Sequence, residues 1–265
     1  MAARLPPYFD ALIAARRAGQ TGRDVHLGFW DDPSAPAEPG EFGAAQARLT
    51  ERVVDRIPLR DGESIVDIAC GFGGTLAVID ARWRGLSLTG INIDARQLQL
   101  CAGAVTRPDN SLTLVAGDAC ALPFPNARFD HAFCVEAMFH FPSRQIFLAE
   151  AARILRPGGY LAVTDILMRP PGSRAPWDND TIAAIVRRDY GPWPELWIEP
   201  ATIVSAGARA GLTLEAGENW SGPTWPGYRT IAPPRPGHPV AAGDVFRWMH
   251  GNGYLTYAMM LFRRP

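Results

Sequence analysis

Short apolar runs alternate with segments whose apolar residues recur at helical spacing through the middle of the chain. The runs indicate strands and the segments between them indicate helices. Strands that alternate with helices of this length predict βαβ units in an α/β fold, with a parallel sheet and helices on both of its faces. Right-handed crossovers then fix most of the topology. The expected strands cover residues 64–69, 86–93, 112–116, 131–135 and 160–165, and the expected helices cover 75–84, 95–105 and 143–159, the last opened by Ser143 and closed by Pro157, Gly158 and Gly159.

The two flanks of this region have a different pattern. Before it, residues 8–18 place Phe9, Leu12 and Ile13 on one helical face, and residues 42–57 predict a second helix that Pro58 ends. After it, residues 167–200 are rich in Pro and Trp and hold a short helix around 179–190. The expected order ends with a helix over 201–211, a strand over 213–219, a Pro/Gly-rich loop over 222–243 and a final apolar strand, "YLTYAMMLF".

Composition and charge narrow the class of partner. The 265 residues carry 26 basic and 27 acidic side chains without a basic tract, which makes nucleic acid a poor candidate. All the basic residues are arginine, so Schiff-base chemistry and a P-loop lysine are excluded. No signal peptide is visible and no apolar run reaches membrane-spanning length, so we expect a cytoplasmic protein with no membrane partner.

The cysteines give no sign of a metal site. Cys70, Cys101, Cys120 and Cys134 form no CxxC pair, and metal-ligand spacing is absent from the sequence. We therefore expect free, partly buried thiols in a reducing compartment and no metal ion.

A glycine-rich turn follows the first expected strand. In "IVDIACGFGG" (65–74), Gly71, Gly73 and Gly74 separate an apolar strand from a helix. Glycine allows a sharp turn and the close approach of a ligand, and the helix that follows directs free N–H groups to the same place. Leu76 stands where the dinucleotide fingerprint needs its third glycine. Asp67, inside the apolar strand, is a buried charge that needs a partner.

Four further segments lie at the expected strand ends. They are "GINIDARQLQLC" (90–101), "GDACALPFP" (117–125), "FDHAFCVEAMFHFP" (129–142) and "EAARILRPGGYLAVTDI" (150–166). Together with "VDIACGFGG", they resemble the class I S-adenosylmethionine-dependent methyltransferases over residues 60–166. "VHLGFWDD" resembles the segment that precedes the sheet in small-molecule methyltransferases of natural-product pathways. The resemblance implies a Rossmann-like, seven-stranded, mostly parallel sheet, with S-adenosylmethionine as cofactor and S-adenosylhomocysteine as product.

The resemblance also implies which residues hold the cofactor. Gly71 and Gly73 would let the loop pass the methionine moiety, Asp67 would orient the loop and the amino group of the ligand, and Trp30 would close over the methionine end. The full set expected to bind the cofactor is Trp30, Asp67, Ala69, Gly71, Gly73, Asn92, Ile93, Gln97, Asp118, Ala119, Leu122 and Glu136.

Some residues expected to contact the ribose and the adenine also have alternative roles. Asn92 departs from the family pattern, in which an acid often holds the ribose, so the charge-assisted bond is lost. Gln97 would be a second ribose or carboxylate contact, although alone it is typical of a surface residue. Asp118 would accept from the adenine amino group, although an acid after a glycine is also typical of a turn or a helix cap. Ile93 and Leu122 would sandwich the adenine.

The expected catalytic residues are His140, Asp165 and Glu136. His140 follows the fourth strand and Asp165 ends the fifth, so the two side chains could meet over the methyl donor. The imidazole would take a proton from a hydroxyl group and the carboxylate would fix its tautomer. Glu136 is the second candidate for the base. The alternative for His140 is a packing or capping role between Phe139 and Phe141.

The tryptophan-rich segment predicts a substrate lid after the fifth strand. Trp177, Tyr190, Trp193 and Trp197 would form it, with some of them facing the acceptor; the alternative is that they pack the insertion onto the sheet. The expected division is an N-terminal helical segment that covers the cofactor site (1–58), a cofactor-binding core (59–166), a lid insertion (167–200) and a C-terminal part of the core (201–265).

These observations favour a methyltransferase that acts on a small-molecule acceptor in secondary metabolism, as a monomer or homodimer. O-methylation is favoured, and N- and C-methylation stay open. One alternative is a cofactor-binding regulatory protein without catalysis. Another is a nicotinamide-dependent oxidoreductase, which needs the missing third glycine and an acid after the second strand.

Overall fold

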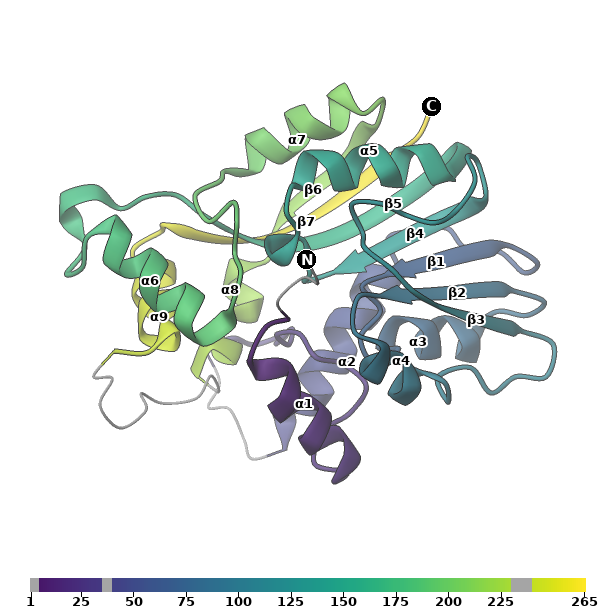
Figure 1. Cartoon of the computed structure of the whole chain (residues 1–265), viewed down its shortest axis with the longest axis horizontal. Coiled ribbons are helices and arrows are strands. Elements are labelled where there is room, and N and C mark those ends of the chain that lie inside the picture. Colours follow the sequence, from purple (N-terminus) through teal and green to yellow (C-terminus); the bar gives the residue numbers. More distant parts are fainter. Residues whose placement is uncertain (1–4, 35–39, 230–239) are drawn as a thin grey trace.

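The computed structural model describes residues 5–34, 40–229 and 240–265, and its centre is a seven-stranded sheet in the order β3-β2-β1-β4-β5-β7-β6 (Figure 1). Neighbouring strands from β3 to β5 are parallel, whereas β7 is antiparallel to both β5 and β6. The predicted fold class, an α/β fold with a Rossmann-like and mostly parallel sheet, is confirmed. The strands are β1 Ser64–Ile68, β2 Ser87–Asn92, β3 Ser111–Ala116, β4 Phe129–Val135, β5 Leu155–Met168, β6 Thr213–Asn219 and β7 Leu255–Arg263.

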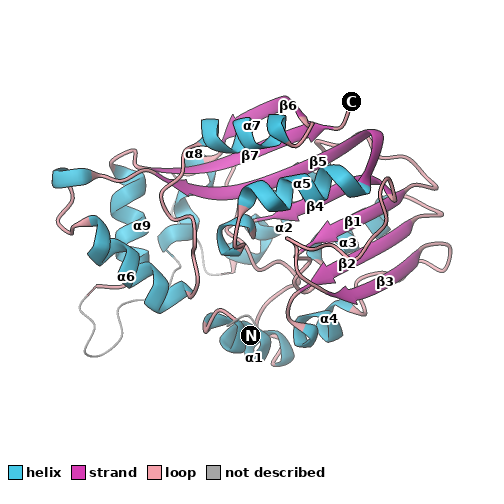
Figure 2. Ribbon diagram, turned by 45° about the horizontal axis from the view of Figure 1, so that its top comes forward, coloured by secondary structure: helices cyan, strands magenta, loops and turns pink. Residues whose placement is uncertain are grey.

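Helices cover both faces of the sheet, as the alternation of elements predicts (Figure 2). Alternate residues of β1 show the two layers: Ile65 packs with apolar residues of α2 and α3, and Val66 packs with those of α5 and α7. Both faces are therefore buried, which explains why the inner strands read as apolar runs. The covering helices are α2 Glu41–Val54, α3 Gly74–Arg82 and α4 Ala95–Cys101 on one face, and α5 Arg144–Ile154 and α7 Pro200–Arg209 on the other.

A second group of helices lies beyond the carboxyl ends of the parallel strands (Figure 1). This group is α1 Tyr8–Arg17, α6 Asn179–Tyr190, α8 Ser221–Thr224 and α9 Ala242–Gly251, with the 3₁₀ turns η1 Met138–His140, η2 Gly172–Arg174 and η3 Trp225–Arg229. In open parallel sheets ligands bind at this edge, so these helices cover the expected site.

Two sequence-based boundaries are wrong. The helix expected over 143–159 ends at Ile154, because the backbone of Leu155 is already extended and β5 begins there; Pro157 lies within the strand. The loop expected over 222–243 contains most of α8, all of η3 and the start of α9, while residues 230–239 lie outside the described residues. α9 forms because Val245, Phe246 and Met249 bury one face of a helix flanked by glycine-rich and proline-rich sequence.

Candidate functional site

Two cavities lie at the carboxyl ends of the parallel strands. The first, of about 340 Å³, we call the nucleoside cavity; the strand ends and η1 form its walls, with Leu5, Pro6 and Phe9 at one side and Pro192 and Pro194 at another. The second, of about 330 Å³, we call the aromatic cavity; its walls come from α1, α2, residues 21–27, η1, α6, η3 and α9. The partition between them includes Tyr8 of the aromatic cavity and His140 of the nucleoside cavity, whose Oη and Nε2 lie 2.8 Å apart.

Several residues expected to bind the cofactor line the nucleoside cavity: Ala69, Asn92, Ile93, Asp118 and Ala119. Ile93 is 45% exposed although it is large and apolar, which leaves an apolar face open to the cavity. Asn92 donates from Nδ2 to Oε1 of Gln97 at 3.0 Å, and both side chains are buried. The surface alternative for Gln97 is therefore wrong. Oδ1 of Asp118 accepts a hydrogen bond from the backbone N–H of Cys120, so the alternative of a turn residue describes one role of this side chain. Its Oδ2 accepts no hydrogen bond from the described residues.

The remaining expected cofactor residues lie outside the lining of the nucleoside cavity. A Cβ on Gly73 would lie 2.6 Å from Sγ of Cys101, so the close packing of α4 requires a glycine at this position. A Cβ on Gly71 would lie 3.1 Å from a methyl group of Val25. Leu122, expected to sandwich the adenine, is buried and does not line the cavity, and its backbone N–H donates to Glu150.

Trp30 lines neither cavity, contrary to the expectation that it closes over the methionine end. Its ring is 1% exposed and stacks on Phe42 with ring centroids 6.0 Å apart. Gly28 provides the space for this ring, because a Cβ there would lie 2.7 Å from it. Trp30 therefore packs the N-terminal segment in place.

The N-terminal segment lies across the glycine turn and brings two acids together. Arg23 donates to the carbonyl oxygen of Phe72, and a Cβ on Gly74 would meet the Asp24 carboxylate. Asp67 is 2% exposed; burial raises its pKa to about 8, although Thr75 and His26 oppose the shift. Two carboxylates next to a glycine turn would suit a cationic group.

His26 is a buried residue of the aromatic cavity that was not assigned a role from the sequence. Its Nε2 lies 2.8 Å from Oγ1 of Thr50 and 3.4 Å from Asp24. Burial disfavours the imidazolium, but the hydrogen bond and charge of Asp24 outweigh it and raise the pKa of His26. His26 belongs to the segment "VHLGFWDD", whose resemblance to small-molecule methyltransferases is the signal that could have identified it.

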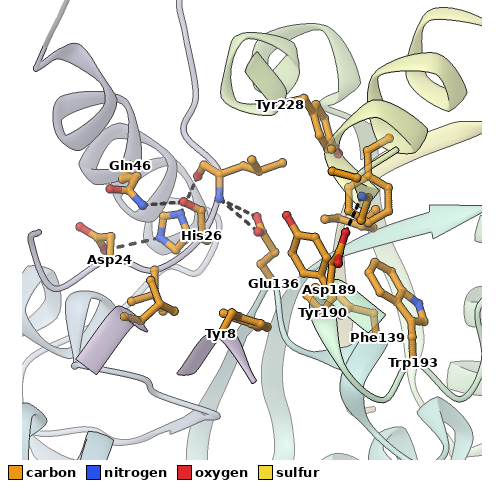
Figure 3. A pocket seen from close by; sticks show the side chains of 18 of the residues that line it. Tyr8, Asp24, His26, Gln46, Glu136, Phe139, Asp189, Tyr190, Trp193 and Tyr228 are labelled. Carbon is orange, nitrogen blue, oxygen red and sulfur yellow. Dashed lines mark hydrogen bonds and ion pairs between the residues drawn. The ribbon is translucent and has the colours of Figure 1, made fainter. Parts of the chain in front are cut away.

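Glu136 follows β4 directly and projects its carboxylate into the aromatic cavity, at the centre of Figure 3. Its φ of 51° lies in the left-handed region, which is uncommon for a non-glycine residue and typical of functional sites. The N–H of Glu136 donates to Thr164, which holds this turn against β5.

Two donors orient the carboxylate. The backbone N–H of Leu27 lies 3.0 and 3.1 Å from its two oxygens, and the Tyr257 hydroxyl donates to Oε2 at 2.8 Å. Burial raises the pKa of Glu136 to about 7, against the opposing effects of His26 and these hydrogen bonds. A carboxyl group with this pKa can accept a proton near neutral pH.

The expected pair of His140 and Asp165 is wrong. His140 Nδ1 lies 2.8 Å from the carbonyl oxygen of Pro192, and its Nε2 faces Tyr8. Because a carbonyl only accepts, Nδ1 carries the proton and Nε2 accepts from the tyrosine. Burial lowers the pKa of His140 to about 4. Its ring also contacts Phe139 with centroids 4.4 Å apart, so the packing role is present.

Asp165 instead pairs with Arg144 of α5. The carboxylate accepts from Nε of Arg144 at 2.6 Å, and neither side chain is more than 1% exposed. Burial raises the pKa of Asp165, although the guanidinium opposes the shift. The arginine therefore occupies the position that the histidine was expected to take, and Asp165 serves the attachment of α5 to the sheet.

The expected lid residues divide into two pairs. Tyr190 and Trp193 line the aromatic cavity, with Trp193 stacked on Phe139 at 4.3 Å. Trp177 packs edge-on against Trp248, and Trp197 bridges to Met168 of β5. The aromatic cavity also contains Tyr8, Asp24, Gln46 and Tyr228, which sequence reasoning missed because they come from four separate segments.

The described part of the chain holds no cluster of metal-ligating side chains: no group of three or more His, Cys, Asp or Glu residues there could hold a metal ion. No helix among residues 5–34, 40–229 and 240–265 is long and apolar enough to cross a membrane. The four cysteines are free, and all but Cys120 are buried.

The sequence of the chain matches known proteins of one family. Residues 66–163 match the family model described as "Methyltransferase domain". An O-methyltransferase of Pyrenophora dematioidea is 33% identical over 195 residues, which cover 73% of this chain and 67% of that protein. The 27-O-demethylrifamycin SV methyltransferase of Amycolatopsis mediterranei is 37% identical over 56% of this chain, and the match spans only about half of that relative's length, 53%.

The fold is shared with solved methyltransferase structures. The geranyl diphosphate C-methyltransferase of Streptomyces coelicolor A3(2) superposes with a TM-score of 0.73 at 16% identity and covers 100% of both chains. Fold, sequence match and the position of the cavities agree, and the chain belongs to the class I S-adenosylmethionine-dependent methyltransferases.

Proposed function

We propose that this chain transfers a methyl group from S-adenosylmethionine to a hydroxyl group of a small organic acceptor. The observation that carries the proposal is the position of Glu136. Its carboxylate enters the aromatic cavity, while the next residue, Ala137, lines the nucleoside cavity. A group that can accept a proton thus lies at the border between a site suited to a nucleoside and a site suited to an organic acceptor.

The nucleoside cavity fits the adenosine part of the cofactor. The exposed face of Ile93 suits one face of a flat ring, and Oδ2 of Asp118 can accept from an exocyclic amino group. The amide pair of Asn92 and Gln97 offers neutral hydrogen bonds to ribose hydroxyls in place of the family's acid. Ala69, which borders the cavity, has a φ of 63°, a left-handed conformation that glycine adopts more readily than alanine.

The methionine end would lie on the glycine turn. Asp67 and Asp24 are the acids there, and the raised pKa of Asp67 indicates a carboxyl group whose negative charge lacks full compensation. A bound ammonium group would stabilise that charge. S-adenosylmethionine supplies an electrophilic methyl group on a sulfonium when it is bound.

The role proposed for the protein is alignment and proton acceptance. The walls of the aromatic cavity would exclude water and hold the acceptor, which accounts for much of the rate in an in-line displacement. Glu136 would accept the proton of the acceptor hydroxyl, because its pKa of about 7 suits a general base at neutral pH. His140 is less suited, since burial holds its pKa near 4 and both ring nitrogens already have partners.

Features of the relatives and of the chain support oxygen as the methylated atom, a role in secondary metabolism and a small-molecule acceptor. The relatives named O-methyltransferases favour oxygen over nitrogen or carbon as the methylated atom. The natural-product names among them favour secondary metabolism, and the absence of a basic tract favours a small molecule over nucleic acid. We further propose a cytoplasmic monomer or homodimer.

Calorimetry and a methylation assay test the proposal together. We expect binding of S-adenosylhomocysteine and no binding of NADH to the purified protein. With S-adenosylmethionine and flat hydroxylated aromatic compounds such as 2-naphthol, mass spectrometry should detect product with one added methyl group. Binding of NADH instead would support the oxidoreductase, and cofactor binding without transfer to any acceptor of this class would support the regulatory protein.

A further inference from the structure

We propose that the acceptor is a flat, uncharged ring compound with a second oxygen atom besides the one that is methylated, and that the Tyr228 hydroxyl binds this second oxygen. The inference rests on the proposed function, because it places the acceptor in the aromatic cavity. It adds the chemical class of the acceptor and a specificity-determining residue from η3, a segment outside the methyltransferase match.

The Tyr228 hydroxyl is a polar group without a partner. The residue is 0% exposed, lines the aromatic cavity, and no described residue makes a hydrogen bond to its hydroxyl oxygen. In Figure 3 the hydroxyl points toward Asp189 and Tyr190, the side of the cavity that faces Glu136. A buried hydroxyl without a hydrogen bond is destabilising, so an oxygen of the acceptor that bonds to it would gain affinity.

Tyr228 is held rigidly in this position. Its ring contacts Phe246 and His250 with centroids 6.3 and 5.7 Å away, and Arg247 donates to its backbone carbonyl at 2.9 Å. The Tyr8 hydroxyl, at the partition, already donates to His140. A fixed donor opposite Glu136 would therefore recognise an oxygen at one set distance from the reacting hydroxyl.

The charges of the cavity favour an uncharged acceptor. Arg188 binds Asp189 at 2.7 Å, and His26 lies beside Asp24, so these charged side chains neutralise one another. The remaining acid is Glu136, whose negative charge would repel a phosphate or a carboxylate on the acceptor. Its pKa of about 7 also means that it is partly neutral at that pH, which weakens the attraction of a cation.

The shape of the walls favours a flat ring. Aromatic side chains from five segments surround the cavity: Tyr8, Phe42, Phe139, Tyr190, Trp193 and Phe246. Such walls bind planar apolar surface well and add little affinity for flexible polar chains. Hydroxylated aromatic or polyketide-like rings combine this surface with two or more oxygens.

Paired probes measure the contribution of the second oxygen. The dissociation constants of 1,3-dihydroxynaphthalene and 2-naphthol would be determined by calorimetry with S-adenosylhomocysteine at saturation. We expect wild type to bind the diol about tenfold more tightly, the range expected for one buried hydrogen bond. Tyr228→Phe should remove this preference and leave the affinity for 2-naphthol unchanged, whereas Tyr160→Phe, on β5 outside the cavity, should preserve it.

Each other outcome overturns the inference in a distinct way. Equal affinity of the wild-type protein for the diol and for 2-naphthol would contradict the role of Tyr228. This measurement uses the wild type alone, so it stands even if Tyr228→Phe fails to fold. A preference that survives in Tyr228→Phe would assign the second oxygen to another residue, and tighter binding of 1-naphthylmethylamine than of the diol would show a cationic acceptor. If 2-naphthol is methylated without a diol preference, this inference fails and the proposed function stands.

Discussion

The two cavities differ in how the chain builds them. The nucleoside cavity is formed mainly by residues 68–142, where successive strands end at one edge of the sheet. The aromatic cavity combines residues from both ends of the chain, from Tyr8 to Phe246. The region that would hold the common cofactor is therefore local in sequence, and the region that would hold the particular acceptor is assembled by tertiary contacts.

The two cavities also differ in the strength of their polar groups. The nucleoside cavity offers amides and a partly exposed carboxylate, as in the hydrogen bond of Asn92 to Gln97. The aromatic cavity holds a half-buried acid with a raised pKa, Glu136, and a buried hydroxyl without a partner among the described residues, Tyr228. The first set suits recognition and the second suits chemistry, and substitutions in the two cavities should therefore have separable effects.

The largest effect is expected at Glu136. Glu136→Gln keeps the size of the side chain and removes the base, so turnover should fall by ~10²–10⁴-fold. The dissociation constant of S-adenosylhomocysteine should stay unchanged, because the carboxylate faces the aromatic cavity. Steady-state kinetics with 2-naphthol would be compared with Glu215→Gln, a control at an exposed position of β6. Loss of cofactor binding in Glu136→Gln would show that the two cavities do not act separately.

Asp118→Ala probes the nucleoside cavity with the opposite expectation. Removal of the carboxylate should weaken the binding of S-adenosylhomocysteine by ~1–3 kcal/mol, the usual cost of losing a buried hydrogen-bond partner. Because Asp118 also accepts from Cys120, thermal unfolding would be measured alongside calorimetry. An unchanged dissociation constant would reduce Asp118 to a turn residue.

Tyr257→Phe tests how the acid is held. The Tyr257 hydroxyl donates to Glu136 and stabilises its charged form, so its removal should raise the pKa of Glu136. The acidic limb of kcat/KM should then move to higher pH, with activity at high pH largely retained. A uniform loss of activity without movement of the limb would indicate a purely structural tyrosine.

The smallest effect is expected at Ala69. A left-handed φ of 63° is unfavourable for alanine, and Ala69→Gly should therefore stabilise the fold by about 1 kcal/mol. Ala77→Gly, in the interior of α3, should instead cost about 1 kcal/mol and serves as the control. Chemical denaturation measures both, and destabilisation by Ala69→Gly would contradict the assignment of strain.

The sequence predicted the parallel half of the fold because local patterns encode it. Buried strands such as 64–69, the turn around Gly71 and the Ser143 cap, which accepts from Ile146, are set by residues close together in the chain. α9 escaped prediction because its buried face depends on contacts with α6 and not on a long periodic run.

Within the site, strand-end positions were predictable and pairings were not. Asn92 and Asp118 border the nucleoside cavity, as expected from their places at the end of β2 and after β3. His140 was the wrong partner to predict for Asp165, because Arg144 of α5 binds this carboxylate. Spacing in the sequence does not predict the direction in which a long side chain such as arginine extends. Tyr228 lies in a proline- and glycine-rich stretch that carries no periodic signal.

The most direct test of the central claim is the pH–rate profile of methyl transfer in wild type, Glu136→Gln and His140→Ala. Burial raises the pKa of Glu136 to about 7, and the base must be unprotonated to act, so wild-type kcat/KM should fall as the pH drops below about 7. We expect His140→Ala to keep this limb and the residual activity of Glu136→Gln to lack it. Loss of the limb in His140→Ala together with its persistence in Glu136→Gln would contradict the account.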